Sequence, residues 1–140
     1  MPLYNPAFLA GGDIFPARFV TISGEFTVSQ VSLITQPIIG VSQEGTFSPP
    51  NLANLLGGTE SGVAASAGNS LKVFGLGDVC MVVAGGTITA GSKVKSGTDG
   101  KALTIGTAAG THQVGGTALN SVVSGEKLLI QVNPHVVVIS

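Results

Sequence analysis

Residues that could do chemistry are few in this chain, and the most suggestive pair is Asp78 and Cys80. A single residue separates them, so on a strand both side chains point to the same face, where an acid could accompany a thiol nucleophile. A neighbouring carboxylate, however, disfavours the thiolate that would attack a substrate. We therefore expect Cys80 to be an inert, buried thiol without a catalytic role.

The two histidines do not complete a catalytic or metal site. His112 follows a glycine turn and is expected at the exposed start of a strand, whereas His135 belongs to the C-terminal tail. Neither is accompanied by Cys, Asp or Glu at the spacing that a metal site or a nucleophile with its base requires. The sequence therefore predicts a protein that is not an enzyme, with no catalytic residue, no metal site and no cofactor.

A lysine-bearing turn leaves one alternative of a different kind. Residues 90–97, AGSKVKSG, look like the hairpin that presents the modified lysine of biotinyl and lipoyl carrier domains. The flanking residues of that hairpin do not match, since Met81 is followed by valine. A small carrier domain is the less favoured alternative, and an intact mass with a covalent group on Lys93, Lys95 or Lys101 would support it.

Composition excludes further classes of function. Only 9% of the 140 residues are charged, against about a quarter in an ordinary soluble domain, so we expect much of the surface to lie against partners. The net charge is −1 and the six basic residues are scattered, which argues against a nucleic-acid partner. No apolar run is long enough to span a bilayer, and the first twenty residues lack the pattern of a signal peptide, so no membrane partner is expected.

Glycine turns between short β-branched runs predict the fold. From residue 78 to 132, runs of Val, Ile, Leu and Thr alternate with glycines, as in consecutive β-strands. We expect Gly85-Gly86, Asp99-Gly100 and Gly115-Gly116 to supply positive-φ residues in hairpin turns. The expected fold class is all-β, a small antiparallel β-barrel or sandwich.

The first half of the chain continues this pattern and then interrupts it. Strands are expected at residues 19–23, 26–29, 31–34 and 38–41. Residues 46–68 break the alternation: prolines precede leucines at helical spacing, and glycines follow. We interpret this segment as a short helical insertion, and long loops on a β scaffold are often functional.

The two termini differ in composition from the domain between them. Residues 1–18 contain three prolines and irregularly spaced aromatics, which indicates an extended N-terminal arm that docks on the domain, a neighbouring subunit or another protein. Residues 134–140 form an apolar C-terminal tail that would close the domain's own sheet edge or add to a neighbour's sheet. The β-barrel domain is then expected at residues 19–133.

A faint internal repeat indicates that the domain consists of two related halves. Residues 19–21 and the glycine at 40 match residues 94–96 and the glycine at 115. After these markers, residues 68–73 match residues 125–130. The longer spacing in the first half identifies the helical segment as an insertion.

The glycine-based motifs of the second half resemble a known family. Residues 79–100, together with residues 114–119 and 124–132, are similar to the capsid decoration or cement proteins of tailed bacteriophages, in particular the group with a small DUF2190-like β-barrel domain. The resemblance implies a structural virion protein on the outer capsid surface, made in the host cytoplasm. It further implies a homotrimer that decorates and stabilises the head by bridging subunits of its partner, the major capsid protein.

The expected contacts, with the capsid or between subunits, are apolar residues of the arm, the insertion and the tail. They are Leu3, Tyr4, Phe8, Phe15, Leu52, Leu55, Leu56, Val137 and Ile139. Another virion β domain, from a tail tube, a tail tip or a fibre, would share this composition. Locating the protein in purified particles would distinguish these possibilities.

Overall fold

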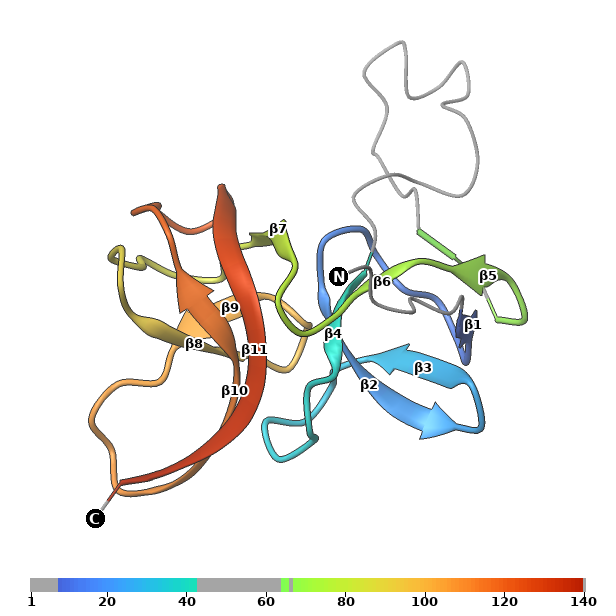
Figure 1. Ribbon diagram of the computed structural model, residues 1–140, viewed down its shortest axis with the longest axis horizontal. Coiled ribbons are helices and arrows are strands. Elements are labelled where there is room, and N and C mark those ends of the chain that lie inside the picture. The colour runs from blue at the N-terminus through green and yellow to red at the C-terminus, as the bar shows by residue number, and fades with distance from the viewer. Residues whose placement is uncertain (1–7, 43–63, 66, 140) are drawn as a thin grey trace, which may run out of the picture.

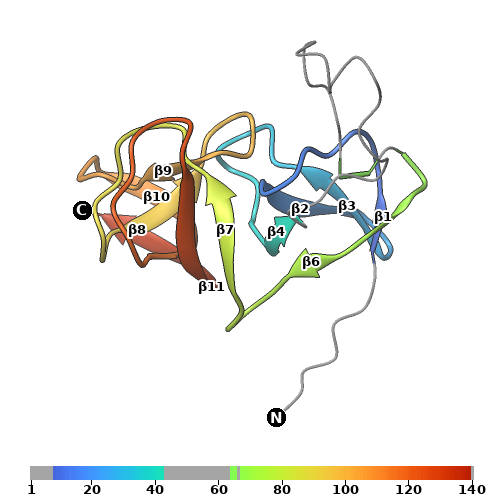
Figure 2. The same cartoon turned by 90° about the horizontal axis from the view of Figure 1, so that it is seen from above.

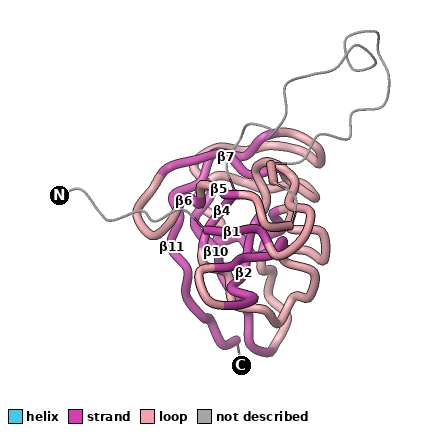
Figure 3. Tube along the Cα trace, turned by 90° about the vertical axis from the view of Figure 1, so that its right-hand side faces the viewer, coloured by secondary structure: helices cyan, strands magenta, loops and turns pink. Residues whose placement is uncertain are grey.

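Two β-sheets, one from each half of the chain, make up the described structure (Figure 1). The computed structural model describes residues 8–42, 64–65 and 67–139, and no helix occurs within these ranges (Figure 3). The all-β prediction is confirmed. The predicted helical insertion falls largely outside the described residues.

The first half forms a six-stranded sheet in the order β5-β1-β3-β2-β4-β6. Its strands are β1 (Phe8–Ala10), β2 (Phe19–Gly24), β3 (Thr27–Gln30), β4 (Gly40–Ser42), β5 (Ser70–Leu71) and β6 (Val73–Phe74). All neighbouring pairs are antiparallel except β1 with β3, which is parallel. Only Lys72 separates the two edge strands β5 and β6, so the sheet is strongly curved.

The second half forms a five-stranded sheet in the order β7-β11-β10-β8-β9. Its strands are β7 (Val79–Val83), β8 (Lys93–Ser96), β9 (Ala102–Thr104), β10 (Gly110–Ala118) and β11 (Lys127–Ile139). A single parallel bridge from Ala84 to Ala102 brings the two edges towards each other. Neither sheet has a continuous ladder that closes it into a barrel, and the two lie side by side (Figures 1 and 2).

The two halves share one arrangement of strands. Isolated antiparallel bridges pair Ile14 with Ala65 and Ile88 with Val122, and in both the isoleucine N–H donates a 2.9 Å hydrogen bond. The same correspondence relates other backbone pairs: Val20–Gly40 with Val94–Gly116, Ala10–Val28 with Ala84–Ala102, and Phe8–Leu71 with Val82–Leu128. The prediction of two related halves is therefore confirmed.

A sequence signature accompanies this correspondence. Residues 9–20, LAGGDIFPARFV, align without gaps with residues 83–94, VAGGTITAGSKV. The match predicted between residues 68–73 and 125–130 agrees with the structure, but the other markers were wrong by one residue. Residue 20, not 19, corresponds to 94, and Gly40 corresponds to Gly116.

The structure has no break at the expected domain boundaries 18/19 and 133/134. Within the predicted arm, Phe8–Ala10 form β1 and Ile14 is fully buried. Within the predicted tail, residues 135–139 continue β11 and pair with residues 110–114 of β10. These segments belong to the sheets because the repeat begins at β1 and because β10 offers the tail a partner strand.

Two of the three expected glycine turns also differ, since neither Gly85-Gly86 nor Gly115-Gly116 has a positive φ. Gly100 has a φ of 78°, as predicted. Gly115 lies inside β10, where a Cβ would collide with the ring of Phe19, so this glycine admits a neighbouring side chain and makes no turn. Residues 31–34 form no strand and lead into a turn at residues 33–36, in which Gln36 N–H donates to Leu33 O. The strand expected at residues 38–41 begins only at Gly40 and runs to Ser42, as β4.

Two hydrophobic clusters hold the halves. The first half is filled by Ala10, Ile14, Val20, Val28, Ala64, Ala65, Leu71 and Val73. The second cluster contains the equivalent residues of the second half and also Phe19, Val31, Ile38 and Val41 from the first. Phe19 thus belongs by sequence to one half and by packing to the other, so the second cluster joins the two halves.

Candidate interaction surface

The thiol and the carboxylate that could have formed a catalytic pair, Cys80 and Asp78, have structural roles. Cys80 lies in β7 and is buried in the second cluster, in agreement with the expected buried thiol. Asp78 Oδ2 accepts a 2.9 Å hydrogen bond from Gly75 N–H, which holds the turn before β7. Among the described residues, no three His, Cys, Asp or Glu side chains come together as metal ligands would.

The histidines lie on the long pair of strands β10 and β11. His112 was expected to be exposed, but it is buried with Nε2 2.9 Å from Ala108 O, because the loop before β10 folds over its ring. His135 Nδ1 lies 2.7 Å from Asn133 O, and its Nε2 lies 3.1 Å from Lys93 Nζ. A carbonyl only accepts and an ammonium only donates, so this geometry fits a neutral ring protonated at Nδ1.

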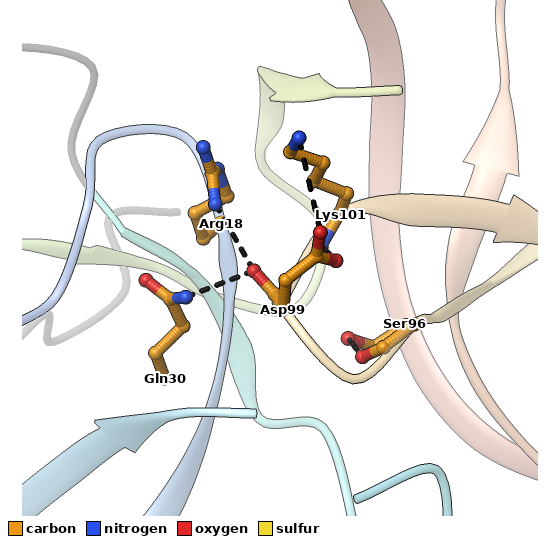
Figure 4. A network of polar contacts seen from close by, with 6 residues as sticks. Arg18, Gln30, Ser96, Asp99 and Lys101 are labelled. Carbon is orange, nitrogen blue, oxygen red and sulfur yellow. Dashed lines mark hydrogen bonds and ion pairs between the residues drawn. The ribbon is translucent and has the colours of Figure 1, made fainter. Parts of the chain in front are cut away.

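Polar side chains meet at the junction between the halves. Arg18 Nη1 and Gln30 Nε2 both donate to Asp99 O, at 3.1 and 2.8 Å (Figure 4). Burial lowers the pKa of the Arg18 guanidinium, and the charge of Asp99 opposes that shift. The guanidinium also lies 5.4 Å from the ring centre of Phe15.

Backbone hydrogen bonds complete this junction. Phe19 N–H donates to Gly100 O at 2.8 Å, and Val83 N–H donates to Ala17 O at 2.9 Å. The segment before β2 is therefore held between β7 and the β8–β9 turn of the second half. Because main chain, side chains and core all cross the junction, the halves are fixed relative to each other.

A two-stranded ribbon extends beyond the second sheet. We call residues 110–114 of β10 and 135–139 of β11 the distal ribbon. Val136 and Val138 point to one face and are 53% and 70% exposed, whereas Val137 points to the other face and is half-buried. β7 pairs with β11 only before the ribbon, and β8 pairs with the ribbon only at Val114. Most of both ribbon edges therefore pair with no strand of the described chain.

The structure places only some of the expected contact residues. Leu3, Tyr4, Leu52, Leu55 and Leu56 lie outside the described residues. The other four are distributed as follows: Phe8 packs against the first core, Phe15 is partly exposed beside Arg18, and Val137 and Ile139 are half-buried in the ribbon. These four therefore do not form one patch on one element.

Sequence reasoning missed three exposed apolar residues that stand out in the structure. Val136 and Val138 alternate with the expected Val137 and Ile139, and the strand period alone could not decide which set faces the solvent. Phe26, in the β2–β3 turn, is 63% exposed and was assigned to a strand. The positive φ required by the aligned Gly100 in the repeat was a signal that could have identified Phe26 as a turn residue.

The comparisons with known proteins show a likeness in fold. No family model matches the chain, and no curated protein matches it. The chain is similar to a solved structure described as the head fiber gp8.5 N base in bacteriophage phi29, with a TM-score of 0.52 and 15% identity over 93% of each chain. At this identity the likeness concerns the fold. Within the described ranges, no helix has the length and apolar character needed to cross a membrane.

Proposed function

We propose that this chain is a structural protein of a phage virion, carried on the head. The observation that supports the proposal most is the fold likeness, which extends over 93% of both chains and concerns a head fibre component. Only 9% of the residues are charged, and the distal ribbon exposes valines, which suits a protein that acts by binding other proteins. Such a role needs no catalytic residue.

The finer proposal is that the chain decorates the head and bridges subunits of the major capsid protein. Glycine-based motifs similar to those of capsid decoration proteins support this choice. A second candidate is a fibre-associated β domain, and the fold likeness to a head fibre base supports it. In both cases, many copies on a lattice gain avidity from individually weak contacts.

The distal ribbon is the proposed surface for the capsid. An isolated two-stranded ribbon is marginally stable in water, so a partner that covers it gains from both its edges and its apolar face. Val136 and Val138 supply the apolar face, and the β11 edge beyond Val132 can pair with an added strand. The partner is a protein with an exposed strand edge or an apolar groove.

Substitution on that face tests the surface. The double variant Val136→Lys/Val138→Lys, made in the full chain, is mixed with purified heads that lack the protein and sedimented. We expect the wild type to be recovered with the heads and the double variant to stay in the supernatant. The control is Val123→Lys, since Val123 is 54% exposed and lies on a turn away from the ribbon.

Position in the particle tests the role. Labelled antibodies against the chain, applied to purified virions in electron microscopy, should decorate the outside of the head. Regularly spaced label over the whole head favours decoration, and label only where fibres emerge favours the fibre-associated role. Label confined to the tail, or particles that contain no copy of the chain, would contradict a protein carried on the head.

A further inference from the structure

A hollow in the second half lies at the position that the junction occupies in the first. Its volume is about 450 Å³, and it is lined by Ser92, Lys93, Thr104, Ile105, Gly106 and Thr107. The repeat pairs three of these residues with junction residues: Ser92 with Arg18, Lys93 with Phe19, and Thr104 with Gln30. The hollow is therefore the second half's copy of the surface that the first half uses to bind the second.

In the first half, this surface seats the β8–β9 turn. A Cβ on Gly100 would lie 2.9 Å from Gln30 Cγ and 3.0 Å from Arg18 Cβ, so only glycine fits against these large side chains. In the second half, serine and threonine replace the arginine and the glutamine. These smaller side chains leave the hollow at the equivalent position, and within the described structure no turn packs into it.

The first half carries a turn of the opposite character. Glu25 and Phe26 stand where the second half has Asp99 and Gly100. Phe26 is 63% exposed and has a φ of 50°, a left-handed conformation that is uncommon for a bulky residue. Non-glycine residues in such conformations cluster at functional sites, where another contact offsets the strain.

Size and charge are complementary between this turn and the hollow. At the junction within one chain, the small residue Gly100 packs against the large side chains of Arg18 and Gln30. In the hollow the sizes are reversed, because the large side chain of Phe26 would pack against the small residues Ser92 and Thr104. Glu25 precedes Phe26 and is anionic, and Lys93 at the hollow is cationic. We propose that Phe26 of one copy of this chain inserts into the hollow of a second copy, so that copies associate head to tail.

The association uses side chains more than backbone. In the first half, Leu9 N–H already donates to Phe26 O at 2.8 Å, so β1 covers the backbone of this turn. The turn of the second half instead accepts from Phe19 N–H of the first half. The contact between copies is thus weaker than the junction and reversible. Each copy has one turn and one hollow, and such a heterologous contact builds a ring or a filament.

Sedimentation velocity of the purified full chain over a range of concentrations tests the proposal. We expect the average mass of the wild type to rise with concentration, and Phe26→Gly to move this rise to at least about tenfold higher concentration. Glycine suits the φ of this turn, so the variant keeps its fold. The control is Leu33→Gly, which is 58% exposed and lies outside both turn and hollow, and it should associate like the wild type.

A charge exchange identifies the two surfaces. Glu25→Lys and Lys93→Glu should each weaken association, and the double variant should restore it, because only then do opposite charges meet again. A wild type that stays monomeric, a Phe26→Gly variant that associates normally, or a double variant as weak as its parents would overturn the proposal. These measurements involve no capsid, so a monomeric chain that still binds heads would refute this inference and leave the proposed function intact.

Discussion

Phe19 and Lys93 occupy equivalent positions in the two halves, yet one is fully buried and the other is exposed. The same contrast holds for Gly100, which is enclosed by the first half, and Phe26, which faces solvent. Inside each half, by contrast, Ile14 and Ile88 are both buried and form equivalent bridges, with Ala65 and Val122. The core residues inside each half are therefore alike in the repeat, whereas the residues on the outside of each half differ.

The distal ribbon is a second difference between the halves. β10 and β11 are nine and thirteen residues long and reach Gly110 and Ile139. Their counterparts in the first half are β4, with three residues, and β5 and β6, with two residues each. The ribbon is thus an addition to the repeated scaffold. Added segments with exposed apolar faces are where a partner is expected, because the scaffold alone does not need them.

Removing Phe19 should have the largest effect on stability. Phe19→Ala deletes a fully buried ring from the core that joins the halves, and we expect a loss of about 3–5 kcal/mol in the free energy of unfolding. Lys93→Ala, at the equivalent exposed position, should stay within about 0.5 kcal/mol of the wild type. Urea unfolding followed by circular dichroism measures both. Equal losses at the two positions would remove the contrast on which the comparison depends.

The shared bridge should respond alike in both halves. Ile14→Ala and Ile88→Ala each open a cavity in a buried cluster, and we expect each to cost about 2–5 kcal/mol. The same denaturation experiment applies, with Ile22→Ala as the control because Ile22 is exposed. If only one of the two substitutions lowered stability, the two halves would not have equivalent cores.

The two turns should respond in opposite directions, by a smaller amount. Gly100→Ala adds a Cβ against Gln30 and Arg18 at a φ of 78°, so we expect a loss of about 1–3 kcal/mol. Phe26→Gly relieves a left-handed residue, so stability should be unchanged or higher by up to about 1 kcal/mol. Thermal melts at low protein concentration separate these effects from association. A destabilised Phe26→Gly variant would indicate that Phe26 already serves its own half.

Much of the fold follows from local pattern, and the exceptions have tertiary causes. Gly/Val alternation predicts an all-β chain, and the glycine at 100 predicts its turn. The repeat was found one residue out of register, since in a chain rich in glycine and valine neighbouring registers look alike; residues 9–20 and 83–94 carry the decisive signature. Gly115 was misassigned because its reason is the ring of Phe19, a contact between distant segments.

The candidate surfaces were harder to predict than the fold. Hydrophobic residues at the termini suggested partner contacts, but period-2 alternation cannot tell which of Val136 and Val137 faces solvent without knowing what covers the sheet. The hollow is invisible in the sequence because it is defined by small residues, Ser92 and Thr104, at positions where the other half has large ones. Only the aligned halves show that something is missing there.

Cross-linking gives the most direct test of the central claim that one half's turn fills the other half's hollow between copies. Equal amounts of unlabelled and ¹⁵N-labelled full chain are mixed, treated with a zero-length carbodiimide and analysed by mass spectrometry. Lys101 Nζ lies 3.8 Å from Asp99 Oδ2, so a link between these residues serves as the internal control. The account predicts mixed-isotope peptides that join Glu25 to Lys93. Mixed-isotope links that join other residues, or a control link with no Glu25–Lys93 product, would contradict it.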